Sequence, residues 1–491
     1  MSHYLKLLHH SSPLRQLPPT WFGVIAVTWP LNKFAYFGQK VSIFRPHNRN
    51  MENNDFAPAV QAGKEAPTLD TSGRVLRGWD PEEAERWSSK LAWSTLAITT
   101  YSMIVAFCVW FLVSAIAPKL NEIGFDLSPA QLYWLGAMPG LSGGLIRLVY
   151  MFLPAKIGTR KMVAWSSLLY VIPMLGWFFA VQNPNTSFAV LILLAFICGI
   201  GGGSFSGYMP STGYFFPKRL SGTALGIQAG IGNLGMSIIQ LAAPALMGFG
   251  LFGITFIAPQ NSETGPLYVH NAAIFFVPWA VVAAVLAFVF LKDVPVKASV
   301  KEQLDIFDNP NTWYMTLLYV MTFGIFSGLC AQFGILVKNN FGGAGLALAF
   351  TGPLIGSVVR FIWGPLCDKF TGGLWTFVSG VGMTASLLFC SFFFDSQNFA
   401  MFYAGMVGMF IFAGIGNAGT FKQMPMIMPK RQAGGAIGFT GAAAAFGPFL
   451  VGVALSLLSA KIFFIGCAIY CGICSIICWQ RYARPSAPFR G

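Results

Sequence analysis

Two arginines, Arg147 and Arg360, are the residues of this chain whose placement most clearly calls for chemistry, because each lies deep within an apolar stretch. A charge near the centre of a bilayer is costly, so an arginine there normally faces a cavity, a partner or a substrate. A structural ion pair for each is the alternative, but none of the 17 acidic residues falls within an apolar stretch. The arginines therefore predict an anionic ligand, and two guanidinium forks suit a planar oxyanion.

A lone amide, Asn233, accompanies glycines in another apolar stretch: Gly226, Gly230, Gly232 and Gly235. Glycines let helix backbones approach closely, and packing alone could account for them. An amide in such a stretch costs free energy unless it is hydrogen-bonded, so we predict that Asn233 contributes to the anion site. A later stretch repeats the glycines but has Ala445 opposite Asn233, so at this position only the N-terminal half offers the amide. The repeated glycines are Gly434, Gly438, Gly441 and Gly447.

A third positive charge, Lys422, lies within an apolar stretch near its end. Two hypotheses stay open for it. It adds a charge to the anion site, or its long side chain reaches the membrane surface while its stem stays in apolar surroundings.

Composition places these residues in a membrane. Of 491 residues, 55% are hydrophobic and 10% are charged, which is too apolar for a soluble globule. A helical span needs about 20 apolar residues, and we predict twelve spans joined by short polar connections. Their predicted limits are 92–118, 128–153, 162–181, 187–215, 223–250, 270–291, 312–337, 343–367, 374–394, 399–427, 433–458 and 461–479.

An internal duplication relates the two halves of the chain. Pro217, Lys218 and Arg219 recur as Pro429, Lys430 and Arg431, and Arg147 matches Arg360, with a glycine four residues before each arginine. The fourth and fifth spans thus correspond to the tenth and eleventh, and the second to the eighth. The sequence predicts an all-α membrane protein of twelve transmembrane helices in two pseudo-symmetric six-helix halves around one central site.

The distribution of the 31 basic residues predicts the topology. Most lie in the N-terminal tail, the even-numbered loops or the C-terminus, and only Lys119, Lys338 and Lys461 lie in the other loops. This positive-inside asymmetry places both termini in the cytoplasm. It also accounts for the net charge of +14 without nucleic acid as a partner.

The predicted organisation has five parts: a cytoplasmic tail 1–91, a six-helix half 92–291, a cytoplasmic linker 292–311, a second half 312–479 and a short tail 480–491. Composition changes at Met51, and we expect translation to start there.

The chain offers little for catalysis or metal binding. All nine cysteines lie in apolar stretches, and the helical stripe of Cys467, Cys471, Cys474 and Cys478 has no histidine or carboxylate beside it. We expect no metal, no cofactor and no enzymatic activity, and the sequence supports neither a membrane sensor nor a membrane-embedded enzyme.

Several motifs resemble a known family. The stretch GTALGIQAGIGNLGMSIIQ from Gly222 to Gln240 is similar to the nitrate signature of the nitrate/nitrite porter family (NarK type) of the major facilitator superfamily. GGLIRLVY and GSVVRFIWGPLCDKF resemble its two arginine helices, and FFPKR matches at Phe215 to Arg219. The resemblance extends from about residue 79 to the end.

The resemblance implies a site as well as a fold. In the family the two arginines bind the substrate anion, the signature asparagine contributes and aromatic rings wall the site. By position it implies Phe205, Tyr319 and Phe323 in addition to Arg147, Arg360 and Asn233. The chain departs from the family pattern at two places. Lys422 stands where relatives have a neutral amide. The loop KIGTRK from Lys156 to Lys161 lacks the acidic residue of many gating motifs, which puts gating contacts at that loop in doubt.

The leading hypothesis is exchange of nitrate for nitrite by alternating access in a bacterial inner membrane. Proton-coupled nitrate symport or nitrite extrusion on the same fold is the alternative, although the spans offer no buried Asp or Glu as a relay and His270 lies at an outer end. A carrier of another small molecule is a remote alternative. The expected partners are nitrate, nitrite and membrane lipid. The sequence leaves the oligomeric state open and is compatible with a monomer.

Overall fold

The computed structural model describes the chain except for residues 1–66, 249–257, 263–264, 296–303, 344 and 491. The expected start at Met51 and most of the predicted N-terminal tail therefore lie outside the described residues. The chain divides into Met1–Gly63 and Lys64–Gly491, and the second unit contains all the helices described below.

The N-terminal part of this unit begins with a short hairpin and continues as helices, several of them broken within one span. Its elements are β1 (Thr68–Leu69), β2 (Leu76–Arg77), η4 (Ala84–Arg86), α1 (Ser89–Trp110), α2 (Leu112–Leu120), η5 (Asn121–Ile123), α3 (Pro129–Tyr150), α4 (Leu153–Ile157), α5 (Thr159–Leu169), α6 (Val171–Ala180), α7 (Phe188–Tyr208), α8 (Pro210–Phe215), α9 (Lys218–Gly248), β3 (Gln260–Ser262), β4 (Gly265–Leu267), α10 (Val269–Ile274) and α11 (Val277–Phe290). The strand pairs β1–β2 and β3–β4 are antiparallel.

The C-terminal part is helical throughout its described residues. Its elements are η7 (Leu304–Asp308), α13 (Pro310–Tyr319), η8 (Val320–Gly324), α14 (Ile325–Phe341), η9 (Leu346–Leu348), α15 (Thr351–Phe370), α16 (Gly372–Phe394), α17 (Phe399–Ile427), α18 (Lys430–Ala445), α19 (Gly447–Leu457), α20 (Ala460–Cys478) and η10 (Trp479–Ala483). The segment η8 is one turn of π-helix inside a span, a feature often found at functional sites.

The predicted all-α membrane fold is confirmed. Among the described residues, eleven helices are long and apolar enough to cross a membrane. The predicted span that is not among these eleven is the second, 128–153. It corresponds to α3, which has 22 residues and so a length of about 33 Å. It is less apolar than the others because its sequence contains four glycines, two prolines and Arg147.

Side chains at the helix starts explain where several spans begin. Ser128 caps α3 in a capping box with Gln131, and Ser187, Asn398 and Ser459 each accept a hydrogen bond from a backbone N–H in the first turn of α7, α17 and α20. Such caps satisfy donors that the helix itself leaves unpaired.

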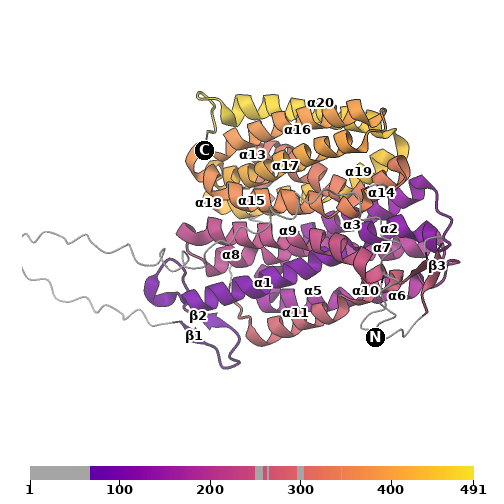
Figure 1. Ribbon diagram of the computed structural model, residues 1–491. Helices are drawn as coiled ribbons and strands as arrows, with labels where there is room; N and C mark the ends of the chain where they lie inside the picture. The colour runs from indigo at the N-terminus through magenta and orange to yellow at the C-terminus, as the bar shows by residue number, and fades with distance from the viewer. Residues whose placement is uncertain (1–66, 249–257, 263–264, 296–303, 344, 491) are drawn as a thin grey trace, which may run out of the picture. The chain divides into compact units, whose positions relative to one another are not determined.

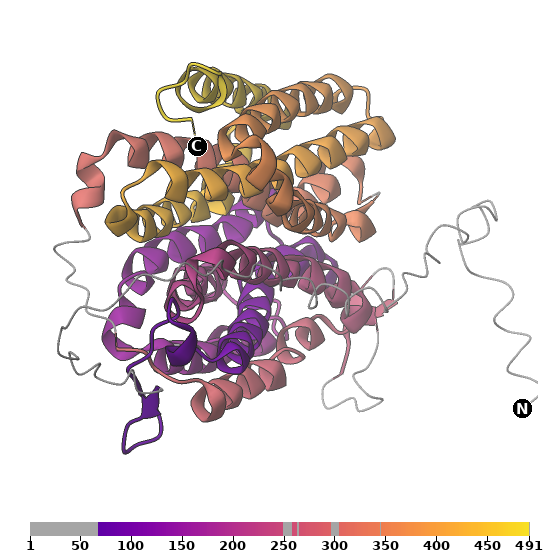
Figure 2. The same ribbon diagram turned by 90° about the vertical axis from the view of Figure 1, so that its left-hand side faces the viewer.

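The helices of Lys64–Gly491 form two bundles that lie side by side (Figures 1 and 2). The first bundle runs from α1 to α11 and the second from α13 to α20. The bundles meet where α3 packs on α19 and α9 packs on α15. Because α3 carries Arg147 and α15 carries Arg360, each arginine lies on a helix that faces the opposite bundle.

Glycines bring some backbones into direct contact. A methyl group on Gly140 of α3 would lie 2.5 Å from the backbone nitrogen of Phe449 in α19, and one on Gly235 of α9 would collide with the carbonyl oxygen of Ile104 in α1. Gly232 packs on Met103 in the same way, whereas nothing lies within 4 Å of the position a methyl on Gly226 would take. Close packing therefore accounts for Gly232 and Gly235 but not for Gly226.

The loop KIGTRK, from Lys156 to Lys161, has no acidic residue of its own, but a carboxylate from another part of the chain pairs with it. Asp293, which follows α11, accepts a hydrogen bond of 2.8 Å from the backbone N–H of Arg160 and lies 3.6 Å from its guanidinium. Burial raises the pKa of the Asp293 carboxyl, while Arg160 and Lys161 act in the opposite direction. Arg160, one of the three basic residues of KIGTRK, is thus paired with a carboxylate at the end of the first bundle.

Candidate functional site

Arg147 is fully buried and only partly satisfied. Its Nε donates to the carbonyl oxygen of Gly202 in α7 at 2.8 Å, and its Nη1 donates to the carbonyl oxygen of Gly441 in α18 at 2.7 Å. The second of these bonds crosses from one bundle to the other. The remaining nitrogen, Nη2, is buried without a hydrogen-bond partner. The NH2 group at Nη2 of Arg147 is therefore free to bind a ligand.

Aromatic rings surround the Arg147 guanidinium. Its central carbon lies 4.7 Å from the ring centre of Phe205, 5.3 Å from that of Trp110 and 5.8 Å from that of Phe323. Contacts of this kind stabilise a cation without supplying a counter-charge.

Arg360 repeats this arrangement in the second bundle. It is 5% exposed, its guanidinium lies over the ring of Phe421 at 4.8 Å, and its Nη1 is buried without a partner. Phe421 belongs to α17, the tenth span. Each arginine thus has an aromatic face beside it and an unsatisfied nitrogen.

The rings form one continuous wall that connects the two arginines. Phe421 lies 6.2 Å from Phe205 and 4.7 Å from Tyr319, and Tyr319 stacks on Phe323 at 5.3 Å with ring planes 7° apart. Phe205 and Phe323 both contact Arg147, whereas Phe421 contacts Arg360. The structure therefore brings together both arginines and the three aromatic residues that the resemblance implied.

The two arginines lack a counter-ion within the part of the chain that the structure describes, where no carboxylate pairs with Arg147 or Arg360. The carboxylates that do form ion pairs, such as Glu122 with Lys119 and Lys338, lie at helix ends. An uncompensated buried charge is strongly destabilising, so the site is built to receive a negative charge.

Asn233 faces the helix that carries Arg360. One turn before it, Gly230 lies against Phe361 of α15, and one turn after it, Ser237 donates to the carbonyl oxygen of Phe350 at 2.9 Å. Residues at this spacing share a helix face. Asn233 is 1% exposed, and neither its amide nitrogen nor its carbonyl oxygen has a partner. The Tyr319 hydroxyl is likewise buried and without a partner.

Lys422 directly follows Phe421 in α17, and neighbouring residues of a helix point about 100° apart. Its side chain is half-buried. Of the remaining predicted glycines, Gly441 supplies its carbonyl to Arg147, while Gly438 packs near the side chain of Met151.

Three neighbours of the site were not anticipated from the sequence: Trp110, Gly202 and Phe421. The contacts of all three depend on how the helices pack against one another. A fourth residue, Asn417, is an asparagine in a glycine-rich span, as Asn233 is. It lies on a different helix from Ala445, the counterpart of Asn233, and it is fully buried with both amide atoms lacking a hydrogen-bond partner.

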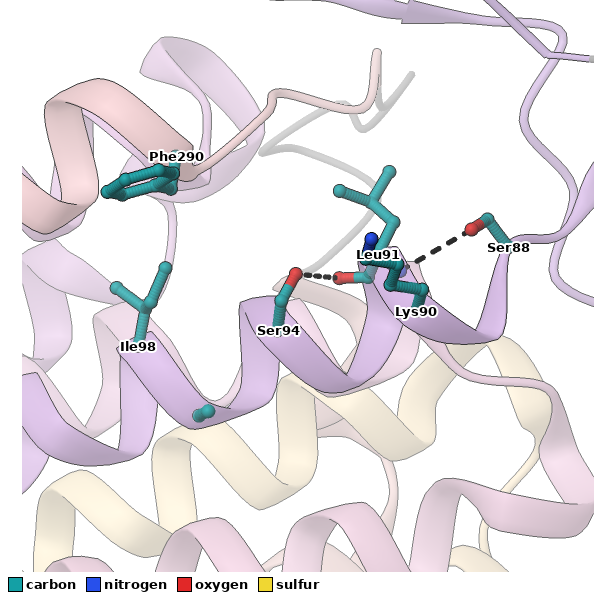
Figure 3. A pocket seen from close by; sticks show the side chains of 7 residues that line it. Ser88, Lys90, Leu91, Ser94, Ile98 and Phe290 are labelled. Atoms are coloured by element: carbon teal, nitrogen blue, oxygen red, sulfur yellow. Dashed lines mark hydrogen bonds between the residues drawn. The ribbon is translucent and has the colours of Figure 1, made fainter.

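A separate hollow lies on the outer surface near the start of α1 (Figure 3). It is lined by Ser88, Lys90, Leu91, Ser94, Ala97, Ile98 and Phe290. Ser94 donates to the Leu91 carbonyl at 3.0 Å, and Ser88 accepts from the Leu91 N–H. The lining is mostly apolar, and Lys90 is its one charged residue.

Comparisons with known proteins agree with the geometry. Residues 99–359 match the model of the Major Facilitator Superfamily. The chain is 47% identical to the probable nitrate/nitrite antiporter NarK2 of Thermus thermophilus, over 84% of this chain and 98% of that protein. It is 34% identical to the nitrate/nitrite transporter NarU of Escherichia coli K12, over 84% of this chain and 96% of that protein.

A solved structure shares the fold. It is a bacterial homologue of the human lysosomal transporter Spinster, with a TM-score of 0.62 and 14% sequence identity over 80% of this chain and 97% of that one.

The unsatisfied arginine nitrogens generate a first prediction. In Arg147→Lys or Arg360→Lys the charge stays but the planar fork is lost, so binding of a planar oxyanion should weaken about tenfold to a hundredfold. Calorimetric titration of the purified protein with nitrate as the probe measures this. Arg77→Lys, at an exposed position in β2, is the matched control and should bind normally. Wild-type affinity in both buried variants would show that the arginines do not hold the anion.

A second prediction concerns Asn233. Asn233→Ala should lower the initial rate of anion transport about tenfold, because a hydrogen bond to a charged ligand is lost, while the protein inserts and unfolds like wild type. Asn340→Ala is the control, since the Asn340 amide donates to Leu336 of its own helix at 2.8 Å. An Asn233→Ala variant that transports at the wild-type rate would assign the amide no part in the cycle.

Proposed function

The chain belongs to the major facilitator superfamily and, within it, to the nitrate/nitrite transporter family, and on this premise we propose that it exchanges nitrate for nitrite by alternating access at the site between Arg147 and Arg360. One observation carries the proposal. Two buried guanidinium groups lie on one aromatic wall, each has a nitrogen without a partner, and the described residues supply no carboxylate to either.

The shape of the site suits a small flat anion. Nitrate and nitrite are planar and weakly hydrated, and the rings of Phe205, Tyr319 and Phe323 present flat faces beside the arginines. The unpartnered donors of Arg147, Arg360 and Asn233 would meet the oxygens of the anion. Hydrogen bonds from charged donors are the stronger kind.

The electrostatics favour exchange over one-way transport. An empty carrier that closes around two like charges would bury both without compensation, so its return should be slow. A monovalent anion carried in each direction removes that cost in both halves of the cycle. Nitrate and nitrite have the same charge, so one-for-one exchange is electroneutral.

The two bundles provide the moving parts of such a cycle. Each contributes one arginine, and the bond from Arg147 to Gly441 ties them at the level of the site. At the ends of α2 and α14, Glu122 bridges Lys119 of its own bundle at 2.8 Å and Lys338 of the other at 2.7 Å. In alternating access the carrier closes first on one side of the membrane and then on the other. We assign this ion-pair cluster to the closure on one of these sides.

The same proposal covers the setting of the protein. The side chains of Phe392 and Leu457 are each 75% exposed on helices of spanning length, and we assign these surfaces to lipid. The excess of basic residues in the tails and even-numbered loops supports a bacterial inner membrane with both termini in the cytoplasm. As a carrier the protein would catalyse no covalent reaction.

Flux through reconstituted vesicles tests the mechanism. Proteoliposomes loaded with nitrite should take up external nitrate more than about tenfold faster than anion-free vesicles, because only the loaded carrier returns with its charges compensated. An inward proton gradient should not restore uptake in the anion-free vesicles. Vesicles that contain Arg147→Lys serve as the control for leakage. Accumulation of nitrate in anion-free vesicles driven by a proton gradient would replace exchange with proton-coupled symport.

A further inference from the structure

We propose that Asn417 is a second amide donor to the bound anion, supplied by the C-terminal half, and that it favours nitrate over nitrite. The inference rests on the proposed function and adds a specificity-determining residue to it. Its starting point is that Asn417 is completely buried while its Nδ2 and Oδ1 both lack a hydrogen-bond partner. Buried amides are normally satisfied, so an unsatisfied one requires an explanation.

The face of α17 that carries Asn417 is the face turned to the site. One turn later in the same helix, Phe421 contacts Arg360 and Tyr319. Three residues before Asn417, Gly414 lies against α15, where a methyl group would come within 2.7 Å of the Gly356 carbonyl oxygen. Residues at i, i+3 and i+7 share one side of a helix, so Asn417 lies between contacts with the Arg360 helix and with the aromatic wall.

Neighbouring positions of α17 confine the amide from the other side. Thr420 lies 3.4 Å from the hydroxyl of Thr322 in η8, and a methyl on Gly416 would collide with the same threonine. Phe323, which follows Thr322, contacts Arg147. Asn417 is thus held between α15 and the π-helical turn, the two elements that bring Arg360 and Phe323 to the site.

The internal repeat gives an independent argument. The segment of α7 from Gly199 to Pro210 and the segment of α17 from Gly414 to Pro425 both begin with Gly-Ile-Gly and end with Met-Pro at the same spacing. In this alignment Asn417 takes the place of Gly202. The carbonyl oxygen of Gly202 accepts a hydrogen bond from Arg147, so the pseudo-symmetry places Asn417 beside the matching arginine, Arg360.

The chemistry of an amide differs from that of the backbone carbonyl it replaces. A carbonyl only accepts, and it can satisfy a guanidinium but not an anion. An asparagine can accept from Arg360 through Oδ1 and donate to the anion through Nδ2. The second half thereby gains a donor at a position where the first half has none.

This donor distinguishes the two substrates by their number of oxygens. Nitrate presents three oxygens and nitrite two. Two guanidinium groups and Asn233 can meet the oxygens of nitrite, whereas the third oxygen of nitrate needs a further donor, the role that we give to Asn417. Its loss should therefore affect nitrate more than nitrite.

The test uses Asn417→Leu, which keeps the branched shape and the number of side-chain heavy atoms and removes both polar atoms. In reconstituted vesicles the KM for nitrate should rise about tenfold, with a smaller rise for nitrite. The substrate-free variant should unfold at the same temperature as wild type or higher, because no protein hydrogen bond is lost and an unsatisfied amide is removed. Weaker binding without lower stability is a combination that a structural amide would not give.

Asn311→Leu is the matched control. Asn311 is also a buried asparagine of the C-terminal half, but its Oδ1 accepts from the Tyr482 hydroxyl at 2.9 Å. Its replacement should lower the unfolding temperature and leave the KM ratio of the two anions unchanged. An Asn417→Leu variant that behaves like this control, or that keeps the wild-type KM for both anions, would overturn the assignment of Asn417. Absence of nitrate exchange by the wild-type protein would instead overturn the proposed function itself.

Discussion

Burial of two like charges, to which the described residues supply no carboxylate, is the constraint on which the rest of this structure depends. Arg147 meets it in part with carbonyl oxygens, which satisfy N–H groups but carry no net charge. Both carbonyls belong to glycines, Gly202 and Gly441, where no side chain stands between the backbone and the guanidinium. Rings stabilise the remaining positive charge by their negative faces. The arrangement leaves two positive charges that no described carboxylate neutralises, and a monovalent anionic ligand compensates one of them.

The two halves share a plan but differ at the site. Matching helices carry the arginines, yet the amide of Asn233 has Ala445 as its counterpart, and the amide of Asn417 has Gly202. Among the described residues, each half thus offers one buried amide with neither polar atom hydrogen-bonded, on a different helix. A perfectly symmetric site would present identical donors from both sides, whereas a nitrate ion that sits off the pseudo-twofold axis needs different ones. Divergence at these positions adapts a duplicated scaffold to one small, flat ligand.

Much of this was accessible from the sequence because it depends on local composition. Apolar stretches of spanning length predict membrane helices, and Arg147 and Arg360 stand out within them because charge is rare there. The span that carries Arg147 is the least apolar, because it combines glycines, prolines and the charge. The arginine that lowers its hydropathy is also the residue that marks the site. The place of Phe205, Tyr319 and Phe323 came from resemblance. Their composition alone would suit any membrane helix.

The contacts that complete the site could not be derived in this way, because they depend on helix rotation and on register between the bundles. The bond from Arg147 to Gly441 joins residues of different halves, and no local pattern in either predicts it. Phe421 is one of several phenylalanines of α17, and only packing shows that it lies over Arg360. The bond to Gly441 also carries a mechanistic consequence. A movement that separates the bundles at the site must release Arg147 Nη1, which would leave this charge with one carbonyl partner and two unsatisfied nitrogens. An anion between the arginines can take over the released donor, so the ligand that supplies the missing charge also lowers the barrier to the movement that carries it across.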